Sequence, residues 1–137
     1  GSGVRVNMVE ADLPLIMANK DSLQKILGNL MQNSLDAVPD GEDAVLDLRW
    51  RVGDESVTLL WADNGMGLDP DVADRLFDPY FSTKSKGTGL GLAICRNLAD
   101  RMGGTIILRN RPDGTAERPG ALAELTLPRM HARNSEG

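Results

Sequence analysis

The sequence predicts an α+β fold, a two-layer sandwich in which helices cover one face of a mixed, mostly antiparallel sheet. Two long stretches, residues 20–38 and 88–102, carry apolar residues at helical spacing. Two strand-like stretches, 44–52 and 56–62, are joined by a short polar link that contains glycine, which is typical of a hairpin. With 137 residues, of which 41% are hydrophobic, the chain is long enough for one compact domain.

The first third of the chain holds a short strand and the first long helix. Residues 4–9 alternate in part between apolar and polar side chains, which predicts a strand, and residues 13–17 form a second short apolar stretch. The helix over 20–38 has Asp21 or Ser22 as its N-terminal cap, and a Pro-Asp-Gly sequence ends it. Its apolar positions lie three and four residues apart: Leu23, Ile26, Leu27, Leu30, Met31 and Leu35.

The second half of the chain is predicted to add a short helix, a loop, the second long helix and the last strands. The link over 111–120 is expected to be a mobile turn, and residues 129–137 a disordered tail, so the domain covers 4–128. In chain order, the remaining elements are a short helix over 70–76, a loop over 77–86, a helix over 88–102 closed by two glycines, and strands over 105–110 and 121–127.

Composition excludes several classes of function. The net charge is −5 and the cations are scattered, which argues against a nucleic-acid partner. No membrane span or signal peptide is visible, and a single cysteine suits a reducing cytoplasm. We therefore expect a cytoplasmic domain without direct membrane contact, with membrane anchoring of the full-length protein left open. The one cysteine, Cys95, lies in an apolar helical pattern and is predicted to be a packed core thiol. The one histidine, His131, lies in the tail and is given no catalytic role.

A glycine run points to phosphate binding. Gly87-Thr88-Gly89-Leu90-Gly91-Leu92 leads into the second long helix, where uncovered backbone N–H groups and the helix dipole favour an anion. Leu92 stands where a dinucleotide fingerprint needs its third glycine, and Lys84 and Lys86 precede the glycines rather than follow them as in a P-loop. Both lysines can reach phosphate oxygens, or they can be ordinary surface residues. Alone the run is weak evidence, because many glycine-rich loops are only turns.

Polar residues on the first helix form a second candidate. Asn29 and Asn33 lie four residues apart and share one face, which Asp36 roughly joins, with the apolar stripe on the other side. Such a row can simply be solvated. An asparagine carbonyl oxygen is nevertheless a hard, neutral ligand that suits Mg²⁺.

Asp63 forms a third candidate, at the end of an apolar strand. Asn64-Gly65 behind it can be a simple turn. A buried carboxylate at a strand end can instead accept a hydrogen bond from an exocyclic amine, and Gly65 and Gly67 would let a flat ring approach the backbone. Such a carboxylate with glycines behind it could recognise adenine.

Together these segments resemble the catalytic and ATP-binding domain of sensor histidine kinases. Residues Asn29–Ala37 are similar to its N box, Asp63–Gly67 to its G1 box, Leu76–Phe81 to its F box and Gly87–Leu92 to its G2 box. The four motifs stand in the right order, and the resemblance covers almost the whole chain. The family belongs to the GHKL group, which shares the Bergerat nucleotide fold with gyrase, the Hsp90 chaperone and MutL. Residues 81–86 look most like nitrogen-regulation-type sensor kinases.

The resemblance implies roles for individual residues. Asn33 is the magnesium ligand, Asn29 helps to bind phosphate and metal, Asp63 reads adenine, and residues 68–87 form a mobile ATP lid. Many relatives have a basic residue where this chain has Asp36, so a phosphate contact there is not implied. The implied catalytic residues are Asn29, Asn33 and Lys84, and the implied nucleotide contacts are Asn29, Asn33, Asp63, Gly65, Gly67, Leu68, Phe81, Lys84, Gly87, Thr88, Gly89, Leu90, Gly91 and Leu92.

The resemblance also implies a reaction. ATP-hydrolysing relatives have a glutamate as general base where this chain has Asn29, so efficient hydrolysis is not expected. We expect Mg-ATP binding and transfer of the γ-phosphoryl group to a histidine on a separate dimerisation domain, with a response regulator downstream and a monomeric isolated chain. Alternatives are a non-catalytic ATP-binding switch, an ATPase of the chaperone or topoisomerase kind, which Asn29 argues against, and an anti-sigma-type serine kinase.

Overall fold

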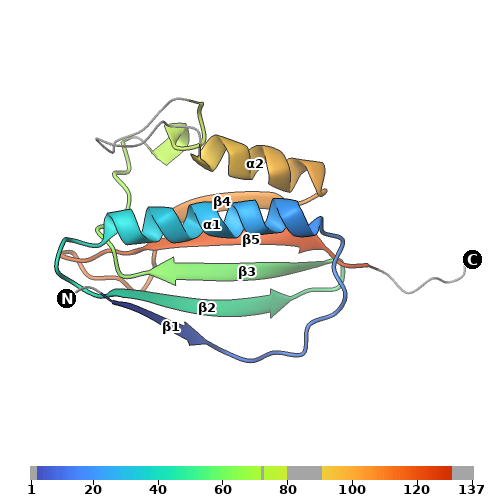
Figure 1. Ribbon diagram of the computed structural model, residues 1–137, viewed down its shortest axis with the longest axis horizontal. Helices are drawn as coiled ribbons and strands as arrows, with labels where there is room; N and C mark the ends of the chain where they lie inside the picture. Colours follow the sequence, from blue (N-terminus) through green and yellow to red (C-terminus); the bar gives the residue numbers. More distant parts are fainter. Residues whose placement is uncertain (1–2, 72, 80–90, 131–137) are drawn as a thin grey trace, which may run out of the picture.

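The computed structural model describes residues 3–71, 73–79 and 91–130. Within these ranges, five strands form one sheet and two α-helices lie together on one side of it, which confirms the predicted two-layer α+β fold (Figure 1). The elements are β1 (Val4–Met8), α1 (Lys20–Ala37), β2 (Ala44–Val52), β3 (Ser56–Asp63), the 3₁₀ helix η1 (Ala73–Arg75), α2 (Gly91–Arg101), β4 (Thr105–Asn110) and β5 (Ala121–Pro128).

The sheet has the strand order β1-β2-β3-β5-β4. Strand β1 is parallel to β2, because α1 carries the chain back across the sheet between them, whereas the other three pairs are antiparallel. In the β2–β3 register Leu46 lies opposite Asp63, so the carboxyl end of β3 lies beside the beginning of β2. The mixed, mostly antiparallel sheet agrees with the sequence prediction.

Helix α1 covers the middle of the sheet. Its fully buried side chains, Ile26, Leu30 and Ser34, lie four residues apart and form one stripe. The predicted cap is wrong: Asn19 occupies the N-cap, and its side chain accepts the backbone N–H of Ser22 at 2.9 Å. Asp21 and Ser22 both lie inside the first turn, where a helix offers N–H groups that need an acceptor.

The core lies between this stripe, α2 and the inner face of the sheet. Cys95 on α2 has no exposed surface, and its burial raises the pKa of the thiol to about 11. The thiol is therefore protonated at neutral pH and inert, as predicted for a packed core residue. Among the described residues, no helix is both long enough and apolar enough to cross a membrane.

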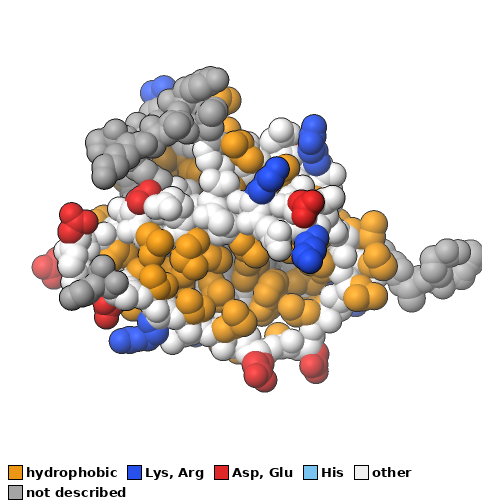
Figure 2. Space-filling model, viewed as in Figure 1, with side chains coloured by type: hydrophobic (Ala, Val, Ile, Leu, Met, Phe, Trp, Pro, Cys, Tyr) orange, Lys and Arg blue, Asp and Glu red, His pale blue; other side chains and the backbone are white. Residues whose placement is uncertain are grey.

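Edge strand β1 has an apolar face that the helices leave open. Val4, Val6 and Met8 lie beside the buried inner face of β2 and are 51%, 45% and 60% exposed. Figure 2 shows hydrophobic side chains gathered beside α1 on this side of the molecule.

The remaining differences from the predicted elements are small. The apolar stretch over 13–17 adds a single bridge, between Ile16 and Arg129, and Met130 donates its backbone N–H to Leu15. The first two residues of the predicted tail are therefore paired, and residues 131–137, with His131, lie outside the described residues. The predicted short helix over 70–76 is one turn of 3₁₀ helix.

Candidate nucleotide site

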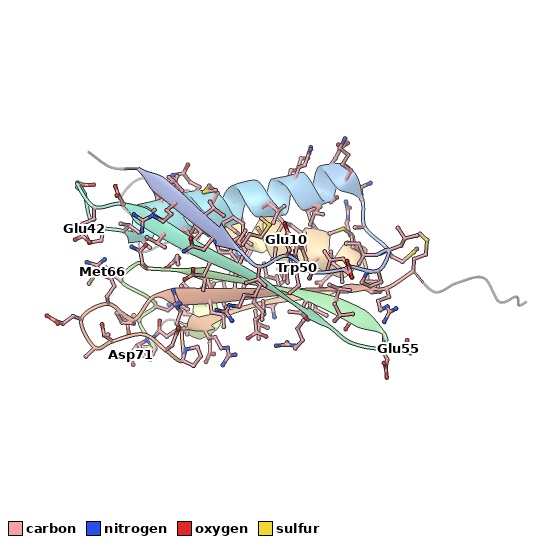
Figure 3. All side chains as sticks on the ribbon, turned by 90° about the horizontal axis from the view of Figure 1, so that it is seen from below. Glu10, Glu42, Trp50, Glu55, Met66 and Asp71 are labelled. Atoms are coloured by element: carbon pink, nitrogen blue, oxygen red, sulfur yellow. The ribbon has the colours of Figure 1, made fainter. Side chains whose placement is uncertain are left out.

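Three segments of the predicted site lie close together on the helix side of the sheet. In Figure 1 the carboxyl ends of α1 and β3 lie at the left, and α2 begins above the middle of α1. Met66, just after β3, lies at the same end as Glu42, and Glu55 marks the opposite end (Figure 3). Met66 donates its backbone N–H to the carbonyl of Ala37 at 3.0 Å, which joins the segment after β3 to the end of α1.

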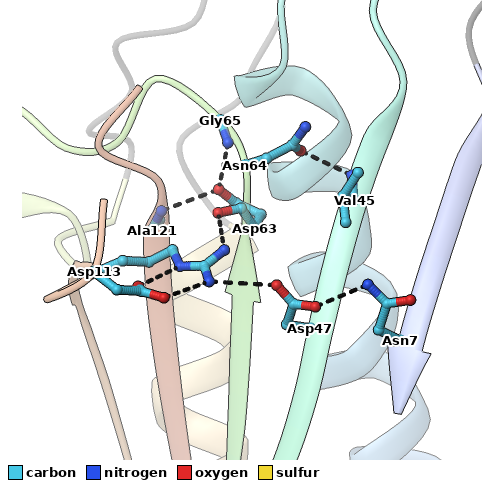
Figure 4. A network of polar contacts seen from close by, with 9 residues as sticks. Asn7, Val45, Asp47, Asp63, Asn64, Gly65, Asp113 and Ala121 are labelled. Atoms are coloured by element: carbon cyan, nitrogen blue, oxygen red, sulfur yellow. Dashed lines mark hydrogen bonds and ion pairs between the residues drawn. The ribbon is translucent and has the colours of Figure 1, made fainter. Parts of the chain in front are cut away.

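The Asp63 carboxylate is buried at the end of β3, where the sequence predicted it, and is only 4% exposed. Its Oδ1 accepts the backbone N–H groups of Gly65 at 2.9 Å and Ala121 at 3.0 Å (Figure 4). Its Oδ2 accepts the Ser34 hydroxyl at 2.9 Å. Three donors from three segments therefore satisfy this buried carboxylate and fix its orientation.

The glycines after Asp63 have a different role from the predicted one. A Cβ at Gly65 would lie 2.6 Å from Cβ of Ala37, and a Cβ at Gly67 would lie 2.6 Å from Oδ1 of Asn110. Gly67 also has a φ of +78°, a backbone conformation that residues with a side chain rarely adopt. The space that a Cβ would occupy at each glycine is filled by the protein's own chain, so both glycines are needed for packing, and their approach to a flat ring stays a prediction.

Leu68 is held by a side chain from β4. Its backbone N–H donates to Oδ1 of Asn110 at 2.6 Å, and Nδ2 of Asn110 donates back to the Leu68 carbonyl at 3.2 Å. The first residue of the predicted lid is thus fixed to the sheet by one amide.

Arg111 fastens the β4–β5 link to the end of β3. One nitrogen of its guanidinium donates to the Asp63 carbonyl at 3.1 Å and another to Asp47 at 3.3 Å. A bidentate pair with Asp113 raises the pKa of Arg111 and lowers the pKa of the Asp113 carboxyl. Asp47 also accepts Nδ2 of Asn7, so the network extends to β1 (Figure 4).

Arg118 and Asn64 add a second fastening. Arg118 donates to the Asn64 carbonyl at 3.1 Å and pairs with Glu42. The Asn64 side chain accepts the N–H of Val45 and donates to the carbonyl of Asp43. Asn64 is thus more than a turn residue, and the link over 111–120, expected to be a mobile turn, is tied to the site at both of its arginines.

The amides predicted on α1 lie beside its buried stripe. Asn29 and Asn33 each precede a buried residue, Leu30 and Ser34, and both are half-buried. The prediction that the apolar stripe lies on the other side of the helix is wrong, because neighbouring helix positions are only about 100° apart and α2 packs against α1 here. Asp36, further along, accepts Nε2 of Gln32 at 2.9 Å.

Asn29 contacts the start of α2. Its Nδ2 donates to the carbonyl of Lys25 at 3.0 Å, and its Oδ1 would lie 2.9 Å from a Cβ placed at Gly91. Gly91 is therefore needed for the close approach of the two helices. The first N–H groups of α2, which favour an anion, thus lie beside the amide row of α1.

The F-box segment also packs against α2. The Phe77 ring contacts the core, and the guanidinium carbon of Arg96 lies 5.1 Å from its centre. Gly91 and Leu92 form the first turn of α2. The predicted contacts Phe81, Lys84, Gly87, Thr88, Gly89 and Leu90 lie outside the described residues.

A divalent metal beside Asn29 and Asn33 would have to bind oxygen ligands that do not come from a cluster of acidic side chains. The described residues contain no group of three His, Cys, Asp or Glu side chains that could hold a metal ion. The neutral amide oxygens of Asn29 and Asn33 suit Mg²⁺, which binds few protein ligands and completes its shell with water and substrate phosphates. The donor set thus fits a magnesium–nucleotide complex.

Four residues that support this site were not predicted from the sequence. They are Ser34, Trp61, Asn110 and Arg111, and each bonds to a candidate site residue or to Ser34 itself. Ser34 carried a signal, since it is a polar residue at a position that continues the apolar stripe of the helix. The partners of Asn110 and Arg111 are distant in sequence, and local patterns do not reveal them.

Two hollows in the described part of the protein do not suit phosphate. A cavity of about 50 Å³ between α1 and the sheet, near Leu27 and Trp50, has apolar walls that give phosphate no partner. A shallow hollow beside Arg49, Leu60 and Asp113 lies at the Arg111 network, and Arg111 is already paired with carboxylates there.

Comparisons with known proteins agree with this geometry. A family model described as "Histidine kinase-, DNA gyrase B-, and HSP90-like ATPase" matches residues 18–131. The C4-dicarboxylate transport sensor protein DctB of Rhizobium meliloti is 37% identical over 115 residues, 81% of this chain and 18% of that protein. The sensor histidine kinase ZraS of Escherichia coli is 36% identical over 116 residues, 85% of this chain and 23% of that protein. This chain thus spans about a fifth of the length of these relatives.

Solved structures agree as well. The catalytic domain of histidine kinase ThkA, in a nucleotide-free form, has a TM-score of 0.74 and 27% identity, covering 93% of this chain and 80% of that one.

Proposed function

Because this chain belongs to the family of histidine kinase-, DNA gyrase B-, and HSP90-like ATPases, we propose that it binds Mg-ATP and donates the γ-phosphoryl group to a histidine on a separate dimerisation domain. The chain is the catalytic domain of a sensor histidine kinase, and the domains of its family bind ATP. The proposal adds the acceptor, which lies on a dimerisation domain of the same full-length kinase, and a response regulator that takes the group onward.

The observation that carries the proposal is the contact between Asn29 and the start of α2. It brings the amide row of α1 to the end of a helix where backbone N–H groups attract phosphate. The Asp63 carboxylate lies buried at the end of the neighbouring strand, where it can accept a hydrogen bond from the adenine amine. The Asp63 carboxylate is thus available for the adenine of ATP, and the amides of α1 and the first N–H groups of α2 are available for its phosphates.

Asn33, with help from Asn29, would hold magnesium. When bound, the metal neutralises phosphate charge and orients the transferred group. Asn29 keeps a fixed orientation through its bond to the Lys25 carbonyl. Lys84 and the glycines from Gly87 onward are proposed to hold the phosphates, and Leu68 and Phe81 to contact the nucleotide.

Asn29 also favours transfer over hydrolysis. A general base must accept a proton from the attacking water, and an amide cannot do this at neutral pH. Phosphoryl transfer to an acceptor depends mainly on positioning and charge stabilisation, which this site can supply without a base for water. The acceptor imidazole supplies its own nucleophilic nitrogen.

Replacing Gly91 with alanine is expected to weaken binding of the magnesium–nucleotide complex about tenfold, as for groups that orient a metal ligand. The new methyl group would lie 2.9 Å from Oδ1 of Asn29 and displace that amide. Gly28→Ala is the matched control, since it changes a helical glycine with nothing within 4 Å of the new Cβ. Titration calorimetry on both variants, with melting temperatures, checks the prediction. Equal affinity of the Gly91→Ala variant and the parent would contradict the role given to Asn29.

The proposed function is tested first by calorimetric titration of the parent chain with a non-hydrolysable ATP analogue, with Mg²⁺ and then with EDTA. We expect binding that is much tighter with Mg²⁺. Binding that is absent, or unaffected by EDTA, would contradict the magnesium–nucleotide site. A chain that binds Mg-ATP but transfers no phosphoryl group to an acceptor histidine would be a switch module rather than a kinase.

A further inference from the structure

A buried relay of three side chains leads to the Asp63 carboxylate. The indole N–H of Trp61 donates to the Ser34 hydroxyl oxygen at 2.9 Å, and the Ser34 hydroxyl donates to Oδ2 of Asp63 at 2.9 Å. Trp61, Ser34 and Asp63 are 6%, 3% and 4% exposed. Trp61 and Asp63 lie two residues apart on β3 and face the helices together, while Ser34 reaches them from α1.

The chemistry of these groups fixes the direction of the relay. An indole N–H is only a donor and an ionised carboxylate is only an acceptor, whereas a hydroxyl is both. Because Trp61 supplies a proton to the Ser34 oxygen, the hydroxyl proton of Ser34 is left to point at Asp63. Ser34 is therefore a fixed donor to Oδ2.

The relay limits what else Asp63 can bind. A carboxylate offers about four acceptor positions, and Gly65, Ala121 and Ser34 together use three of them. Both backbone donors lie on Oδ1, so the position that remains is on Oδ2, beside the Ser34 hydroxyl. This remaining position on Oδ2 can accept a hydrogen bond but has no proton to donate. A base with an amine at this place is therefore favoured over one with a carbonyl oxygen.

We propose that Ser34, held by Trp61, is the positioning residue that makes Asp63 selective for adenine over guanine. The inference rests on the proposed nucleotide site and names how that site chooses its purine. Without the Ser34 hydroxyl, Oδ2 loses the donor that fixes it, and the Asp63 carboxylate is held through Oδ1 alone, by Gly65 and Ala121. A buried polar side chain in an apolar stripe is unfavourable unless its hydrogen bonds are made, which is consistent with a specific role at position 34.

The test is the ratio of ATP to GTP affinity in the Ser34→Ala chain, measured by calorimetry with Mg²⁺. We expect the preference for ATP to fall about fivefold to tenfold, which lies within the range that one typical intramolecular hydrogen bond contributes. Thr58→Val is the matched control. It removes a buried hydroxyl that bonds Thr126 at 2.8 Å, and Thr58 lies on the same strand but on its opposite face. We expect that variant to keep the parent's ratio.

A second variant keeps the test decisive if Ser34→Ala does not fold. Trp61→Phe removes the indole donor but keeps a ring in the core, and it should reduce the preference in the same direction. The indole N–H resonance of Trp61 should also shift when ATP is added to the parent chain, and this shift should be absent in Ser34→Ala.

The outcomes separate the two proposals. An unchanged ATP to GTP ratio in the variants, or an equal loss in Thr58→Val, would overturn the role of Ser34 while leaving the nucleotide site intact. A parent chain that binds ATP and GTP equally would overturn the adenine-reading role of Asp63, and this inference with it.

Discussion

Replacing Asn33 with alanine is expected to weaken binding of the magnesium–nucleotide complex by about 100-fold or more. Changing a group that merely supports a metal ligand typically weakens metal binding by about 10–100-fold, and here the ligand itself is removed. Asn33 flanks the buried stripe of α1 rather than belonging to it, so the fold should survive. Calorimetry with an ATP analogue and Mg²⁺ measures the loss.

Two controls make this prediction specific. Gln32→Ala removes a neighbouring amide whose partner is Asp36, and it should bind the complex like the parent. In EDTA, the parent and Asn33→Ala should bind the free nucleotide alike, because only the metal-dependent part of the affinity is lost. Tight magnesium-dependent binding by Asn33→Ala would show that Asn33 is not the ligand.

Asp63→Asn is expected to reduce ATP affinity by about 1.5–3 kcal/mol and to remove the preference for ATP over GTP. With the amide oxygen in the place of Oδ1, the backbone donors of Gly65 and Ala121 keep their acceptor. The new NH₂ group then lies beside Ser34 and presents a donor to the adenine amine, which is also a donor.

The control for charge is Asp47→Asn. Asp47 lies on β2 at the same end of the sheet, but it pairs with Arg111 and Asn7 rather than facing the helices. Loss of one carboxylate there should leave the nucleotide preference unchanged. If Asp63→Asn binds ATP as selectively as the parent, adenine is read by another group.

Much of the fold could be predicted because local patterns of apolar and polar residues indicate its helices and strands. The bounds of β2 and β4 agree with the predicted 44–52 and 105–110, since β2 alternates between apolar and polar side chains and β4 is a short apolar run that follows two glycines. The cap of α1 could not be chosen from the sequence alone. Asn19, Asp21 and Ser22 are all good capping residues, and only the entry path of the chain selects Asn19.

The placement of Asp63 could be predicted from the sequence, whereas contacts between distant segments could not. Asp63 could be identified because a carboxylate ending an apolar strand needs donors, which the structure supplies. The packing role of Gly65 could not be predicted, because the close approach of Ala37 depends on how α1 lies against the strand. Arg111 was missed, because its bond to the Asp63 carbonyl spans 48 residues.

The central claim is that this domain gives the γ-phosphoryl group to a histidine elsewhere and does little else with ATP. The measurement is incubation of the chain with γ-labelled ATP and Mg²⁺, first alone and then with a separately produced helical domain that carries an acceptor histidine. Alone, the chain should release phosphate slowly, because Asn29 gives water no general base, and it should acquire no stable label. With the acceptor present, label should appear on the acceptor histidine and be lost in acid. Brisk phosphate release without the acceptor, or stable label on His131 of the chain alone, would contradict the account.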